Sequence, residues 1–148
     1  MKFQIAQINI ARFRLPPDHP DNREFVDNVD RVNAIAEAAP GFVWRLIGDG
    51  NNALDVKAFD DPHIAVNLTV WTSLEALSDF VYRNPDHLDI MRRRKQWFGH
   101  LDLYMALWWV PEGHRPTLQE SVAKLDLLGR NGPSAEAFTF RQPFPPPG

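Results

Sequence analysis

The sequence predicts an α+β protein, a ferredoxin-like βαββαβ unit followed by a C-terminal helix. Four segments have the pattern of strands, at residues 3–10, 42–46, 64–71 and 104–110. Helical patterns separate the first strand from the second and the third strand from the fourth. This order is that of the split βαβ motif, in which helices cover one side of an antiparallel sheet.

The chain of 148 residues is expected to form one domain. We assign residues 3–110 to the ferredoxin-like core. Residues 111–148 add a helix, a short strand and a proline-rich tail.

The first strand and the helix after it follow from local patterns. Alternation along the strand puts Gln7 and Asn9 on the same face. Asp21 and Glu24 then have the spacing of a capping box, which predicts a helix that ends at Pro40-Gly41.

The second strand carries a charge, Arg45, on one of its faces. A charge in that position needs a partner. The partner of Arg45 is either an acidic residue of the chain or a ligand carboxylate. The polar segment Gly48–Pro62 then leads to the third strand as a hairpin link.

The third strand sorts into two unlike faces. One face is fully apolar, and we expect it to pack under the helices. The other, called here the mixed face, carries Ala65, Asn67, Thr69 and Trp71. We expect a partner subunit or a ligand to enclose the mixed face partly, because a face open to solvent would leave the Trp71 indole uncovered.

Two helices follow the third strand. Thr72 and Glu75 have capping-box spacing for the first of them. Asn84-Pro85 stops that helix and starts the second, with asparagine as N-cap and proline in the first turn. His87 falls in the first turn of this second helix, where the helix dipole favours a neutral imidazole.

The last core strand places Trp108 and Trp109 on opposite faces. Beyond it, Thr117 and Glu120 predict a third capping box and a helix. Residues 138–140 are expected to form a short edge strand before the tail PFPPPG.

Composition excludes several classes of function. The net charge of −3 argues against nucleic acid, and no apolar run approaches the roughly 20 residues of a membrane span. The absence of cysteine excludes disulfides and thiolate metal sites and fits a cytoplasmic protein. We find no metal motif, phosphate-binding loop or hydrolase elbow.

The candidate catalytic residues are His87, Asn9 and Trp71. In the functional interpretation they line one cavity, with the imidazole as base or ligand. The alternative is a surface imidazole, a sheet-edge amide and a core indole.

The candidate substrate-binding residues are Asn67, Arg45, Trp109 and Arg94. Asn67 can polarise a ligand oxygen, and Trp109 lines either a pocket or an interface. Arg94 is the member of the basic run 92–95 on the His87 side. The run as a whole suits a solvated face with ion pairs to Asp89.

From Asn67 to Ala76 the chain reads N-x-x-x-W-x-S-x-E-A, followed by Phe80 and His87. In these residues it resembles the antibiotic-biosynthesis-monooxygenase-like group. The resemblance implies a homodimeric α+β barrel, in which two ferredoxin-like sheets close on each other.

Within that group, haem-degrading monooxygenases use an asparagine, a tryptophan and an iron-ligating histidine. The resemblance puts these roles on Asn9, Trp71 and His87. It leaves the cofactor open between haem and none.

The segments LWWVPEGHRPT and GPSAEAFTF, at 107–117 and 132–140, resemble an uncharacterised bacterial family of such barrels. We therefore expect a small aromatic or apolar molecule as ligand. A cofactor-independent or haem-dependent oxygenase and a non-catalytic, stress-associated binding protein are both consistent with the sequence. A third interpretation is that the mixed face is only a dimer interface and encloses no cavity.

Overall fold

The computed structural model describes residues 2–48, 59–101 and 103–148. Within them, an antiparallel sheet has the strand order β2-β3-β1, with β4 and β5 both paired to the far side of β1. Its strands are β1 (Phe3–Phe13), β2 (Phe42–Arg45), β3 (Ile64–Trp71), β4 (Phe98–Gly99) and β5 (Met105–Pro111). The order confirms the predicted ferredoxin-like fold. The short β4 was not predicted.

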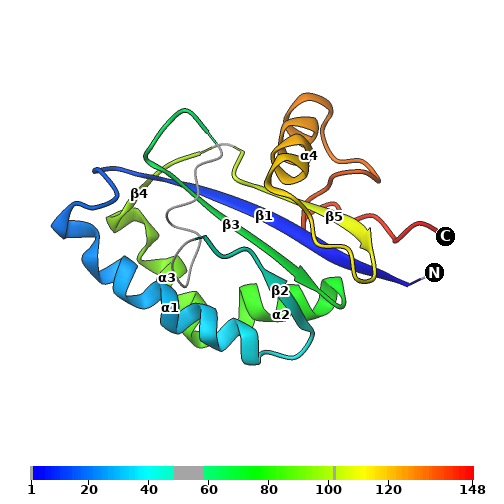
Figure 1. Ribbon diagram of the computed structural model, residues 1–148, viewed down its shortest axis with the longest axis horizontal. Helices are drawn as coiled ribbons and strands as arrows, with labels where there is room; N and C mark the ends of the chain where they lie inside the picture. The colour runs from blue at the N-terminus through cyan, green and yellow to red at the C-terminus, as the bar shows by residue number, and fades with distance from the viewer. Residues whose placement is uncertain (1, 49–58, 102) are drawn as a thin grey trace.

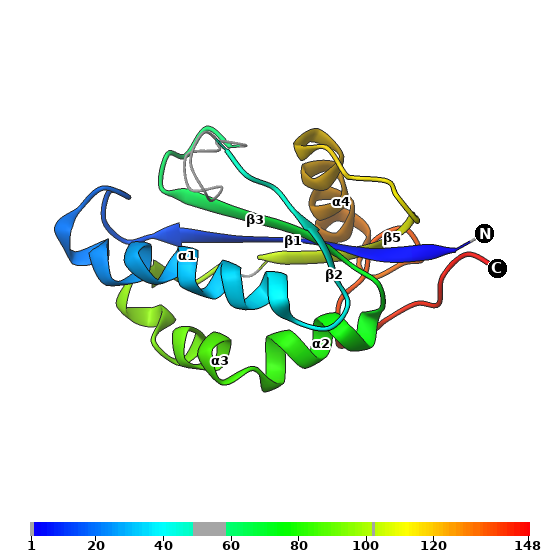
Figure 2. The ribbon, with the colours of Figure 1, turned by 60° about the horizontal axis from the view of Figure 1, so that its bottom comes forward.

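The helices lie on both sides of the sheet. Their bounds are α1 (Arg23–Ala38), α2 (Leu74–Arg83), α3 (Pro85–Arg92) and α4 (Leu118–Asn131), with short 3-10 turns η1 (Pro20–Asn22) and η2 (Arg94–Gln96). In Figures 1 and 2, α1, α2 and α3 lie on one side of the sheet and α4 lies on the other.

The mixed face of the sheet lies under α1 and α2, which differs from the prediction. Trp71 packs in one buried cluster with Ala36 of α1 and Leu77 of α2. The apolar face of β3 packs instead against Leu125 and Leu128 of α4. Both faces are therefore covered within one chain, because the added C-terminal helix takes the side that a four-strand unit leaves open.

Two of the four predicted N-caps are confirmed. Asn84 Oδ1 accepts hydrogen bonds from the backbone N–H groups of Asp86 and His87, at 3.0 and 3.2 Å. Thr117 Oγ1 accepts one from the N–H of Glu120 at 3.0 Å.

The other two predicted caps were wrong by one residue. Ser73, not Thr72, caps α2, since its Oγ accepts from Ala76 N while Thr72 N donates to Gly41 O. Asp21 lies within η1, and Asn22 precedes α1 without a side-chain cap bond.

The C-terminal segment returns to the edge of β5. Leu107 and Phe138 exchange two backbone hydrogen bonds of 2.8 Å, which form an isolated antiparallel bridge. The expected edge strand is therefore reduced to one bridge. Most of the predicted link Gly48–Pro62 lies outside the described residues.

Candidate functional site

A chain of hydrogen bonds crosses the mixed face. Gln7 Nε2 donates to Asn67 Oδ1 and to Thr69 Oγ1, both at 2.7 Å. Trp71 Nε1 donates to the same hydroxyl at 3.0 Å. The indole of Trp71, a predicted catalytic residue, is thus fixed to the sheet through its only hydrogen-bond donor.

Asn9 and Asn67 are directly opposite partners in the β1–β3 register, and both are only partly buried. Such partners have Cβ atoms about 5 Å apart. The structure therefore brings these two predicted residues together. Their pair lies four residues from Trp71, or roughly 13 Å along the strand.

Four aromatic side chains make a continuous row from β2 to α3. Phe42 meets the Trp71 ring edge-on at 5.3 Å, and Phe80 stacks on Trp71 at 5.3 Å. The His87 ring lies 5.1 Å from Phe80. Phe80 of α2 is thus the link between two predicted catalytic residues, Trp71 and His87.

Local backbone structure fixes the tautomer of His87. Its Nδ1 lies 2.9 Å from the carbonyl oxygen of Val81. Since a carbonyl only accepts, Nδ1 carries the proton and Nε2 keeps its lone pair in the neutral ring. In the described part of the chain, no hydrogen bond engages Nε2. His87 therefore has a proton-acceptor position available.

The environment keeps His87 neutral. Burial lowers the pKa of its imidazole below the ordinary 6.5, and the hydrogen bond to Val81 opposes this shift in part. A neutral ring at physiological pH is the form that accepts a proton or binds a metal.

This shift predicts how stability depends on pH. The unfolded chain protonates His87 near pH 6.5 and the folded chain only at lower pH, so the unfolded state binds more protons in between. Stability should therefore fall as pH drops from 6.5 towards the folded pKa, with no contribution above 6.5. Urea unfolding at pH 7.5, 6.5 and 5.5 should show a steeper loss for wild type than for His87→Asn. Equal slopes would contradict the lowered pKa.

A surface cleft of about 510 Å³ adjoins this aromatic row. It lies between the end of α1, the start of β2 and one side of α2. Its lining consists of Ala39, Pro40, Gly41, Thr72, Ala76, Asp79, Phe80, Arg83 and Asn84. The volume falls in the range of small-molecule sites. Five of the lining residues have no polar side-chain atom, and four are polar or charged.

Gly41 allows the cleft to form at this place. Its φ is +86°, and a Cβ there would lie 2.5 Å from Ala76 Cβ and 2.8 Å from Thr72 Oγ1. Only glycine tolerates both the positive φ and this approach. The turn after α1 therefore comes directly against α2.

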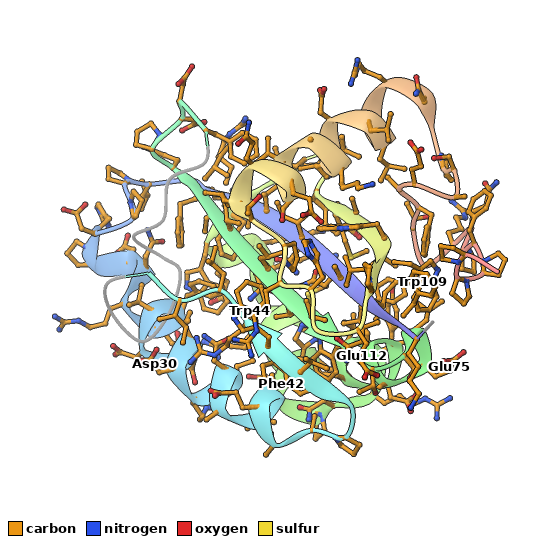
Figure 3. The ribbon with its side chains drawn as sticks, turned by 45° about the vertical axis from the view of Figure 1, so that its right-hand side comes forward. Asp30, Phe42, Trp44, Glu75, Trp109 and Glu112 are labelled. Atoms are coloured by element: carbon orange, nitrogen blue, oxygen red, sulfur yellow. The ribbon has the colours of Figure 1, made fainter. Side chains whose placement is uncertain are left out.

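Three predicted substrate-binding residues have partners within the chain. Arg45 is buried and donates to Glu37 of α1 at 3.2–3.3 Å, so an acidic residue is one of its partners. Trp109 Nε1 donates to Phe144 O at 2.9 Å, beside the C-terminal tail in Figure 3. Arg94 is exposed and donates to Met91 O at 2.6 Å. None of the seven predicted site residues lines the cleft; Trp71 and His87 meet it only through Phe80.

Sequence reasoning missed most of the cleft. Phe80 was noted within the motif, but the helical stripe that contains it is also typical of a core position. Gly41 after Pro40 was interpreted only as the end of a helix. A helix-ending glycine with an apolar strand directly after it was the one available signal for a close approach of elements.

The residues present do not fit a haem between Trp71 and His87. The resemblance gives both residues roles at a haem, but the Phe80 ring contacts both of their side chains. Among the described residues, no group of three or more His, Asp or Glu side chains is placed to hold a metal ion. In the same residues, no helix has the length and apolar character to cross a membrane.

Comparison with known proteins places these features in a family. A family model described as "Domain of unknown function (DUF3291)" matches residues 4–148. A search of curated proteins gave no match.

Several solved structures have a similar fold. Rv0793 from Mycobacterium tuberculosis is 14% identical with a TM-score of 0.52, and the alignment covers 77% of this chain and 99% of that one. SnoaB, a cofactor-independent oxygenase from Streptomyces nogalater, is 20% identical with a TM-score of 0.49, covering 79% and 98%. A dabb family protein with a ferredoxin-like fold from Mesorhizobium loti is 13% identical with a TM-score of 0.45, covering 74% and 99%.

Proposed function

The chain belongs to the DUF3291 family, whose function is unknown, and we propose that it binds a small aromatic molecule in the cleft between α1 and α2. The observation that carries this proposal is the cleft itself, which adjoins the Trp71–Phe80–His87 row. Its apolar wall suits a planar hydrocarbon ring. Polar groups for one or two ligand oxygen atoms come from Thr72 and Asn84, and from Asp79 and Arg83 at the rim.

His87 is the proton acceptor of the proposed site. Its neutral ring has Nδ1 held by Val81, which orients the ring and leaves Nε2 as the base. A ligand with an acidic hydroxyl group, such as a phenol or hydroquinone, matches this acceptor. Asn9 and Asn67 form a separate pair of amides farther along the mixed face, outside the lining of the cleft.

The proposed chemistry is an oxidation by molecular oxygen that begins with proton transfer to Nε2. For a hydroquinone, the ring loses two electrons and two protons to give the quinone, and oxygen becomes hydrogen peroxide. A protein that binds the aromatic ligand without accelerating its oxidation would have the non-catalytic function instead.

A leucine at position 76 tests the binding site. Ala76 lines the cleft, so Ala76→Leu should fill it and weaken binding of 1-naphthol by at least about tenfold, since overfilling a packed site costs about 1–3 kcal/mol. Ser78→Leu adds the same side chain to α2 away from this cleft and should leave the affinity unchanged. Isothermal titration calorimetry measures both. Equal affinities in the two variants would place the ligand elsewhere.

The homodimer and the cytoplasmic location stay predictions of this proposal. Helices cover both sheet faces, and Leu68, Val70 and Trp108 on the apolar face are at most 1% exposed. We propose that the homodimer leaves this face as it is in the single chain.

A further inference from the structure

Two charged residues at the rim of the cleft, Asp79 and Arg83, form an exposed ion pair along α2. Arg83 Nε lies 3.6 Å from Asp79 Oδ1, beyond hydrogen-bond distance, and the arginine and aspartate side chains are 82% and 65% exposed. In the described part of the chain, the guanidinium makes no hydrogen bond. An exposed pair of this kind contributes little to stability. The N–H donors of Arg83 are therefore available to a ligand at low cost.

Arg83 lies closer to the apolar wall of the cleft than Asp79 does. At about 100° per residue of α2, Arg83 is about 20° from Ala76 and about 60° from Phe80 around the helix axis. Asp79 is about 60° and about 100° from the same two residues. The guanidinium also has the longer stem. A ring bound against Ala76 and Phe80 therefore meets the cation of the pair before the anion.

Asn84, the residue after Arg83, also presents a donor to the cleft. Its Oδ1 already accepts hydrogen bonds from the backbone N–H groups of Asp86 and His87. The remaining polar group of its side chain, the Nδ2 amino group, can only donate. This end of the cleft thus offers donors from two consecutive residues, which favours a ligand group that only accepts. A carboxylate is such a group.

A second cleft leaves room for an acidic group at this rim. Its volume is about 570 Å³, and Asp79 and Arg83 line it as they line the first cleft. Its lining also includes Arg141 and Phe140, whose ring meets that of Tyr82 edge-on at 5.3 Å. Arg83 therefore stands on a ridge between two hollows. A substituent that reaches this ridge from the first cleft is not blocked by a wall.

We propose that the ligand of the cleft is an aromatic acid, whose carboxylate binds Arg83 and Asn84 at the end of α2. This inference rests on the proposed function for the position of the aromatic ring. It adds the chemical class of the ligand and the residue that selects it. The ligand carboxylate replaces Asp79 as the partner of the guanidinium. It forms the short, charge-assisted hydrogen bonds that Asp79 does not make at 3.6 Å.

Two ligands that differ only in the acid group test the inference. 6-Hydroxy-2-naphthoate is 2-naphthol with a carboxylate added at the opposite end of the ring system. At pH 7.5 and low salt, wild type should bind the acid at least about tenfold more tightly than 2-naphthol, the usual effect of a hydrogen bond to a charged group. This advantage should shrink as sodium chloride is added, because the rim is exposed to solvent. Isothermal titration calorimetry measures both affinities.

Substitutions in the ion pair should change the affinity for the acid in opposite directions. Arg83→Gln should remove its advantage over 2-naphthol. Asp79→Asn should raise the affinity for the acid about two- to fivefold, since the competing carboxylate is gone. Arg130 and Asp126 form the same i,i+4 pair on α4, with side chains 68% and 65% exposed, and line neither cleft. Arg130→Gln and Asp126→Asn are therefore the matched controls and should leave both affinities unchanged.

The outcomes separate this inference from the proposed function. If 2-naphthol binds and Ala76→Leu weakens it, but the acid binds no more tightly, the inference is refuted and the proposed function stands. The same holds if Arg83→Gln keeps the full advantage of the acid. A loss of affinity for the acid in Asp79→Asn would also overturn the inference, because the anion of the pair would then hold the ligand. If neither ligand binds, the proposed function fails and the inference fails with it.

Discussion

Replacement of His87 by asparagine is expected to slow the oxidation of 1,4-naphthohydroquinone by about 10²–10⁴-fold, the usual contribution of a positioned general base. Asparagine Nδ2 takes the place of imidazole Nδ1, so the hydrogen bond to Val81 O is kept. The acceptor at Nε2 is lost. Oxygen uptake, corrected for the uncatalysed reaction, measures the rate.

His114→Asn is the matched control for this experiment. His114 contacts Glu120 at 2.8 Å and, unlike His87, does not touch Phe80 or any other residue of the aromatic row beside the cleft, so its replacement should leave the rate unchanged. Equal rates in wild type and His87→Asn would refute the role of His87 as general base. If wild type binds the hydroquinone but does not accelerate its oxidation, the non-catalytic binding function is favoured.

Replacement of Trp71 by alanine should cost about 3–5 kcal/mol of the free energy of unfolding, as for other large buried aromatic side chains. Trp71 is 1% exposed, packs against Phe42 and Phe80, and donates to Thr69. Its loss leaves a cavity beneath α2. Urea denaturation at pH 7.5 measures the change.

Trp71→Phe and Trp44→Ala give the comparison for this prediction. Phenylalanine keeps the stacking on Phe80, and Trp44 is only partly buried, so both variants should lose less than Trp71→Ala. A loss below about 1 kcal/mol for Trp71→Ala would show that the indole is not a core residue. It would then be available to stack on a ligand.

The four longer strands and the second helix of the α2–α3 pair were predictable because their signals are local. The alternation in β3 gave its bounds, Ile64–Trp71, and Asn84-Pro85 marked the break between the helices. The assignment of faces failed for a reason that alternation cannot reveal. Period two separates the two faces of a strand, but it does not say which helices cover each one.

The candidate site was predictable only in part. His87 was identified from its place in a first helical turn, and Asn9 and Asn67 from their shared face. The cleft depends on Gly41 meeting Ala76, two residues from different elements whose approach is a tertiary event. The choice of Glu37 as one partner of Arg45 depends likewise on how α1 packs against β2.

The most direct test of the proposed site is an NMR titration of the isotopically labelled wild-type protein with 1-naphthol. The account predicts that the largest backbone amide shifts fall on Gly41, Ala76, Phe80 and Asn84, and that the His87 ring signals move with them. Shifts centred on another surface, with these residues unchanged, would contradict the cleft as the binding site.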